Sequence, residues 1–178
     1  MRIGFLCSRV RVEEKLLMQE LDRRDVNWER IDDGDLILDF DDDSFPYDLV
    51  FERSVSFGRS LYTLEALEAR GVRCINSAQL VATCGDKAKA SVALQQHGVP
   101  QPRGSVTFTP EAALRSLDEL GYPAVIKPVV GSWGRLVARV NDRDAAEAVL
   151  EDRATLGSWQ QKIFYIQELV DKPGRDIR

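Results

Sequence analysis

Histidine is almost missing from this chain, since His97 is the only one among its 178 residues. A catalytic triad built on histidine is therefore not expected. His97 precedes Gly98 and Pro100, and this order predicts that it ends a helix beside a glycine cap. The chemistry of the protein must depend on other side chains.

Cysteine is also scarce, and its spacing indicates no framework. The chain has three cysteines, Cys7, Cys74 and Cys84, which is an odd number, and no two of them have CxxC spacing. Neither a disulfide frame nor a zinc site is therefore indicated. No apolar run reaches the length of a membrane span, and no N-terminal signal region is visible. We therefore expect a protein of the reducing cytoplasm with no membrane partner.

An excess of positive charge is missing as well. The formal net charge is -5, which argues against a general nucleic-acid binder. Hydrophobic residues make up 44% and charged residues 30%, the ordinary balance of a soluble globular chain with one domain or two small ones. The acidic run from Asp41 to Asp43 is interpreted as a solvated loop rather than a metal site.

Two common nucleotide-binding fingerprints are absent. No GxGxxG follows the first predicted strand, and no GxxxxGK followed by Ser or Thr occurs in the chain. The first absence argues against a Rossmann dinucleotide site, and the second excludes a P-loop. Any phosphate-binding site must therefore use a different backbone.

The first 76 residues alternate between strand and helix patterns. Apolar runs predict strands at 2–7, 26–31, 48–53 and 72–76, with a short additional strand at 36–38. Helical periodicity predicts helices at 13–24 and 58–71. This alternation predicts an α/β fold with a Rossmann-like parallel sheet and flanking helices.

The second half has another pattern. It predicts helices at 77–84, 86–97, 109–121 and 142–150, and strands at 105–108, 124–127, 136–140 and 163–170. Strand pairs joined by a flexible segment are typical of an α+β module. The proline-rich segment 99–102 predicts a linker. We therefore divide the chain into residues 1–84, a helix and linker at 85–102, and a module at 103–178.

The stretch from Pro123 to Val137 reads PAVIKPVVGSWGRLV and gives the main chemical signal. An apolar strand ends in Lys127, a glycine-containing flap follows, and a second strand returns. Glycines let backbone amides approach an anion closely, and Lys127 and Arg135 supply positive charge. A lysine at a strand end is usually a surface charge, but this combination predicts a site for nucleotide phosphates.

Three other segments are weaker candidates. Lys87 opens a helix, where the helix dipole disfavours a cation unless an anionic ligand lies nearby. The run Gln167 to Val170 ends a strand and could offer backbone groups to a purine, although an amphipathic strand end fits equally well. Asp176 could accept hydrogen bonds from ribose hydroxyls, or it could be a solvated loop acid.

Together these motifs resemble the ATP-grasp superfamily, and within it the RimK/LysX group. The resemblance is carried by FERSVS at 51–56, CGDK at 84–87, GVPQP at 98–102, GYPAVIKPVVGSWGRLVARV at 121–140 and FYIQELVDKPGRDIR at 164–178. It implies a pre-ATP-grasp domain followed by the first ATP-grasp subdomain. The second ATP-grasp subdomain is absent from these residues.

The resemblance also implies roles for single residues. Lys87 and Lys127 match lysines that hold phosphates. The flap over the triphosphate matches Gly131, Ser132, Trp133, Gly134, Arg135, Leu136 and Val137, and the hinge that receives adenine matches Gln167, Glu168, Leu169 and Val170. Asp176 matches a ribose contact, and Arg178 lies in the matching GRDIR motif as a candidate catalytic residue.

The activity implied by the resemblance is ATP-dependent amide formation. A LysX-type ligase joins α-aminoadipate or glutamate to the carboxy-terminal glutamate of the carrier protein LysW. A RimK-like glutamate ligase acting on a ribosomal protein and a non-catalytic ATP-binding module are the alternatives. The implied cofactors are ATP and Mg²⁺, whose protein ligands are expected beyond Arg178, and a homo-oligomer is expected for the full-length form.

Overall fold

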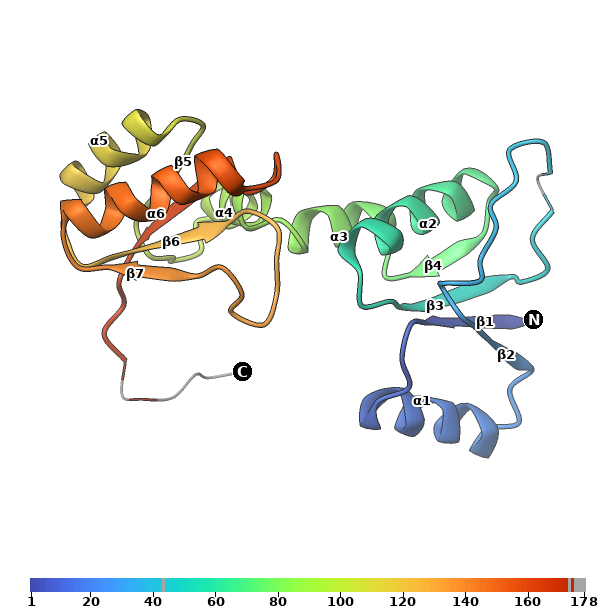
Figure 1. Ribbon diagram of the computed structural model, residues 1–178. Coiled ribbons are helices and arrows are strands. Elements are labelled where there is room, and N and C mark those ends of the chain that lie inside the picture. The colour runs from blue at the N-terminus through green and yellow to red at the C-terminus, as the bar shows by residue number, and fades with distance from the viewer. Residues whose placement is uncertain (43, 173, 175–178) are drawn as a thin grey trace. The chain divides into compact units, whose positions relative to one another are not determined.

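The computed structural model describes residues 1–42, 44–172 and 174 (Figure 1). The chain forms two compact units, Met1–Cys84 and Gly85–Arg178. The first contains a parallel sheet and the second an antiparallel sheet. The predicted fold class is therefore confirmed, and each unit is described by itself.

The sheet of the first unit has four parallel strands in the order β2-β1-β3-β4. The strands are β1 (Ile3–Cys7), β2 (Trp28–Ile31), β3 (Leu49–Arg53) and β4 (Arg73–Ile75). All five residues of β1 are buried, as expected for a central parallel strand with both faces covered. The continuous apolar run at the N-terminus is the sequence signal for this position.

Three helices accompany this sheet: α1 (Val12–Arg23), α2 (Phe57–Ala69) and α3 (Ala78–Cys84). Figure 1 shows α1 and α2 on opposite sides of the sheet. Leu67 of α2 packs into a cluster with Leu6 and Val50. On the other face, Glu14 of α1 accepts hydrogen bonds from the guanidinium of Arg53 in β3 at 2.7 and 2.9 Å. The predicted βα alternation is present.

The predicted short strand at 36–38 is wrong, since this segment is irregular. Leu36 and Leu38 pack against the Leu6 cluster, whereas Ile37 between them is 87% exposed. The alternation is therefore real but belongs to an irregular segment lying on the core. Apolar alternation reports which side chains are buried, and it does not report whether the backbone pairs with a strand.

The second unit begins with α4 (Lys87–Gln96) and contains an antiparallel sheet in the order β5-β8-β6-β7. Its other elements are β5 (Gly104–Thr107), α5 (Pro110–Leu120), β6 (Ala124–Pro128), β7 (Ala138–Val140), α6 (Arg143–Leu156) and β8 (Phe164–Glu168). Asp86, Thr109 and Asp142 cap the starts of α4, α5 and α6 with their side chains. His97 ends α4, as predicted, and its Nδ1 lies 2.8 Å from the carbonyl oxygen of Ala93.

Helices α5 and α6 lie together on one face of this sheet (Figure 1). Leu117 of α5 and Leu150 of α6 are fully buried against Ile126 and Ile166. The strand register pairs Lys127 with Tyr165 and Val125 with Gln167, so alternation directs these four side chains to the other face. We call this second face the open face because neither α5 nor α6 covers it, although Val125 and Tyr165 are buried there, and it carries the candidate site.

Several predicted boundaries differ from the structure, and three of them lie in the second half of the second unit. The strand predicted at 136–140 begins only at Ala138, because Leu136 has a left-handed φ of 58°. The last strand ends at Glu168 rather than at residue 170, and α6 continues to Leu156 rather than residue 150.

Within the described residues, no helix combines the length and apolar character needed to cross a membrane.

Candidate functional site

Lys127 lies near the end of β6 on the open face, where it is half-buried. Its Nζ donates a hydrogen bond to Gln167 Oε1 on the neighbouring strand β8, at 2.5 Å. The same Nζ lies 5.9 Å from the ring centroid of Tyr165. Two strands therefore position the ammonium group through a neutral amide and an aromatic ring.

Lys87 is the first residue of α4, and three contacts join it and Asp86 to the start of the flap. Its backbone N–H donates to the carbonyl of Val129 at 2.9 Å, and Asp86 forms an isolated bridge with Val130. The Lys87 ammonium donates to the carbonyl of Gly131 at 2.9 Å. The lysine at the helix start and the flap are thus one local structure, although they lie about forty residues apart in sequence.

The electrostatics of the two lysines fit an anion. Burial lowers the pKa of Lys127, and the charges of Lys87 and Lys172 lower it further. Burial also lowers the pKa of Lys87, partly opposed by the carboxylate of Asp86. Burial therefore disfavours the charged form of each ammonium group, and an anion placed between the two would stabilise that charged form again.

The flap, residues 131–137, is exposed along its length. Positive φ angles occur at Gly131 (150°), Trp133 (63°), Gly134 (67°) and Leu136 (58°). Two weak backbone hydrogen bonds of 3.3 Å, from Arg135 to Ser132 and from Val137 to Gly134, close successive turns. Successive turns with left-handed residues are typical of backbone loops whose N–H groups bind anions.

The predicted hinge residues divide into two groups. Gln167 faces the lysine, and its amide also lies 3.4 Å from the Tyr165 hydroxyl. Glu168 is turned to the other face, where it accepts hydrogen bonds from the backbone and side chain of Arg103, both at 2.9 Å. Leu169 and Val170 follow the end of β8 and are 36% and 51% exposed. The carboxylate of Glu168 is therefore paired with Arg103 away from the lysine, and its backbone N–H also donates to the carbonyl of Arg103, at 2.9 Å.

The predicted ribose contact Asp176 and the candidate catalytic residue Arg178 lie outside the described residues. Among the residues that the structure does describe, no group of three or more His, Cys, Asp or Glu side chains is arranged to hold a metal ion. No magnesium ligand is therefore assigned.

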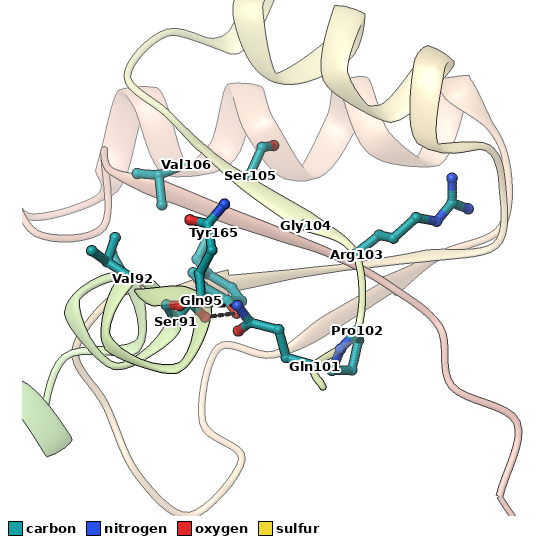
Figure 2. A pocket seen from close by; sticks show the side chains of 11 residues that line it. Ser91, Val92, Gln95, Gln101, Pro102, Arg103, Gly104, Ser105, Val106 and Tyr165 are labelled. Carbon is teal, nitrogen blue, oxygen red and sulfur yellow. Dashed lines mark hydrogen bonds between the residues drawn. The ribbon is translucent and has the colours of Figure 1, made fainter. Parts of the chain in front are cut away.

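A second feature of the open face was not predicted from the sequence. Helix α4, the edge strand β5 and Tyr165 enclose a pocket of about 510 Å³. Figure 2 shows Ser91 and Tyr165 side by side in its wall, with their hydroxyl oxygens 2.7 Å apart. Tyr165 is two residues before Gln167 in a strand, so period-two alternation would have placed both on the same face.

Comparison with known proteins identifies both units. The model of the LysX preATP-grasp domain matches residues 3–83. The model of the RimK-like ATP-grasp domain matches residues 84–178. These matches fall on the two compact units of the structure.

Curated relatives match over nearly the whole chain. The glutamate–LysW ligase ArgX of Sulfurisphaera tokodaii is 36% identical over 178 residues, which cover 100% of this chain and 63% of that relative. The α-aminoadipate–LysW ligase LysX of Saccharolobus solfataricus is 37% identical over 171 residues, covering 94% of this chain and 62% of the relative. The chain thus spans less than two thirds of the length of these relatives.

The fold has a close counterpart among solved structures. A RimK domain ATP-grasp protein from Sphaerobacter thermophilus superposes with a TM-score of 0.84 and 26% identity, over 97% of this chain and 65% of that one. Sequence, family models and fold agree, and the chain belongs to the RimK-like ATP-grasp family.

Proposed function

We propose that the protein is an ATP-dependent ligase that joins a carboxylate to the amino group of an amino acid. The observation that carries this proposal is the pair Lys87 and Lys127, both half-buried and both with a lowered pKa, at the base of an exposed flap. Two cations at the base of a loop rich in backbone donors suit the triphosphate of a nucleotide.

Each part of the site has a role in this proposal. Lys87 and Lys127 hold phosphate oxygens, and the amides of Gly131 to Val137 cover the triphosphate. The backbone of Gln167 to Val170 receives the adenine. Asp176 contacts the ribose, and Arg178 is the catalytic residue. A lysine and a phosphate ~4 Å apart attract each other by about 4 kcal/mol at an effective dielectric constant near 20.

The chemistry needs no protein nucleophile. A carboxylate oxygen of the acceptor attacks the γ-phosphorus of ATP, ADP leaves, and an acyl phosphate is formed. The amine nitrogen of the amino acid then attacks the acyl carbon, inorganic phosphate leaves, and the nitrogen loses a proton to give the amide. The protein contributes positioning and charge stabilisation by Lys87, Lys127 and the flap amides.

Magnesium belongs to the proposal by family membership, because ATP-grasp proteins act on ATP together with this ion. When bound with ATP, it would neutralise part of the charge of the triphosphate. No described residue is assigned to hold it. The residues discussed above act on the nucleotide directly through lysine and amide donors.

The substrates are proposed from the relatives. Both relatives reported above are named as LysW ligases, one for glutamate and one for α-aminoadipate, and their identities to this chain are similar. We propose a LysW-like carrier protein as the acceptor, with glutamate and α-aminoadipate as the two candidate amino acids. A cytoplasmic location and a homo-oligomeric full-length form are part of the same proposal.

The test is product formation by the protein at the length that its gene encodes. The purified protein is incubated with ATP, Mg²⁺, a LysW-type carrier and either glutamate or α-aminoadipate, and the mass of the carrier is measured. We expect the carrier to gain one amino-acid residue, with phosphate released in equal amount. A carrier whose mass stays unchanged with both amino acids would contradict the ligase proposal.

A further inference from the structure

Arg153 is a buried charged residue that the phosphate site described above does not use. It lies in the last turn of α6 and is only 8% exposed. Its Nη2 donates hydrogen bonds to the carbonyl of Leu136, at 2.5 Å, and to the carbonyl of Ile126, at 3.4 Å. One guanidinium group therefore contacts the strand that leads into the flap and the last turn that leads out of it.

The register of β6 and β7 explains why a donor is needed there. Ile126 pairs with Ala138, so a continued ladder would place Pro128 opposite Leu136. Pro128 has no N–H group and cannot donate to the Leu136 carbonyl. The pairing of β6 with β7 stops at Ile126 and Ala138, and beyond it the Leu136 carbonyl accepts from Arg153.

The burial of Arg153 is costly, which indicates a specific role. In the part of the chain described by the structure, Arg153 forms no ion pair, although the charge of Asp152 acts on it, and its Nη1 is buried without a hydrogen-bond partner. A buried cation without a carboxylate partner is destabilising unless its contacts compensate. The contacts present are one carbonyl inside β6 and one carbonyl near the C-terminal end of the flap.

We propose that Arg153 is a positioning residue that clamps the last turn of the flap to β6, the strand that carries Lys127, and so holds the flap amides near this lysine. Lys127 directly follows Ile126, so the same clamp fixes the strand end that carries this lysine. The clamp acts on the proposed ATP site, and this part of the inference rests on the proposed function. Its effect on the flap itself does not depend on any nucleotide.

The first test measures the flap without nucleotide. Trypsin cuts after Arg135 inside the flap and after Arg115 inside α5, and mass spectrometry gives the rate of each cut. In Arg153→Met, whose side chain is apolar and of similar length, we expect cutting after Arg135 to accelerate at least about 5-fold relative to cutting after Arg115. Cutting after Arg115 reports unfolding of the unit, so a variant that is merely less stable accelerates both cuts equally.

Two further variants make the test specific. Arg153→Lys keeps the charge and one donor, and we expect it to restore part of the protection of the flap. Arg143→Met makes the same change in the first turn of the same helix, where Arg143 is exposed and pairs with Asp118 and Glu147. This control is expected to leave the ratio of the two cuts unchanged.

The second test is calorimetric titration with ATP and Mg²⁺ of the wild-type chain and the same three variants. We expect Arg153→Met to weaken binding about 10-fold and Arg143→Met to leave it within about 2-fold. If the wild type does not bind ATP but the flap of Arg153→Met is still cut faster, the ATP site is wrong and the clamp stands. An unchanged ratio of the two cuts in Arg153→Met, whatever the ATP result, would overturn the clamp.

Discussion

Lys127 on β6 and Gln167 on β8 form a hydrogen bond in which the partner of the lysine is a neutral amide oxygen. A glutamate at this position would pair with the ammonium and cancel its charge. The amide instead orients the lysine and leaves its positive charge uncompensated. This arrangement suits a lysine whose partner is an anionic ligand.

Changing Gln167 to Glu should therefore weaken ATP binding. The new carboxylate lies at hydrogen-bond distance from Lys127 Nζ, stabilises its charged form and repels the triphosphate. We expect the dissociation constant for ATP to rise about 10-fold or more, measured by calorimetry. Gln96→Glu adds the same charge on the exposed end of α4 and serves as the control. Equal affinities of the two variants would show that Gln167 does not adjoin the phosphate site.

The affinity for ATP should fall with rising pH before ordinary lysines titrate. The free protein has a lowered pKa at Lys87 and Lys127, so these groups lose their protons below the usual lysine value of about 10.4. ATP binds the protonated forms, so deprotonation of the free protein weakens binding. Titrations from about pH 8 upward should show this decline, and Lys127→Met should show a shallower one. A decline whose midpoint lies at or above the usual lysine pKa would contradict the account.

Glu14 should be important for the stability of the first unit. It is fully buried, and the hydrogen bonds from Arg11, with those from Arg53, lower its pKa to about 2. A lowered carboxyl pKa adds stability that is complete above the usual pKa of 4.5 and is lost as the pH falls toward about 2. Glu14→Gln should lose about 3 kcal/mol of unfolding free energy at neutral pH, measured by urea denaturation.

The control for Glu14 is its neighbour on the same helix. Glu13 is exposed, so Glu13→Gln should change the free energy of unfolding by no more than about 0.5 kcal/mol. The wild type should also lose more stability than Glu14→Gln when the pH falls from 4.5 to about 2. Parallel pH profiles for these two proteins would mean that Glu14 is not the acid-sensitive group.

Local signals in the sequence predicted the fold well. Asp86, Thr109 and Asp142 each cap a helix through N–H groups within three residues, so the information lies beside the helix that it starts. The pairing of β6 with β8 could not be assigned in this way, because its register joins residues about forty positions apart. The false strand at 36–38 arose because burial alternates there without backbone pairing.

The candidate site was predictable only in part. Lys127 and the flap are contiguous, and glycine next to a cation is a signal that one segment carries alone. The contact between Lys87 and Gly131 and that between Arg153 and Leu136 join distant segments, and no local pattern marks them. The apolar side chain of Leu136 predicts a strand residue and does not reveal a left-handed backbone.

The most direct test of the account is calorimetric titration of the chain with ATP and Mg²⁺, comparing the wild type with Lys127→Met. Lys162→Met, an exposed lysine just before β8, is the matched control. The account predicts one ATP bound per wild-type chain, affinity at least about 100-fold weaker in Lys127→Met, and wild-type affinity in Lys162→Met. Equal ATP affinity in the wild type and Lys127→Met would contradict the phosphate site, as would a wild-type chain that binds no ATP.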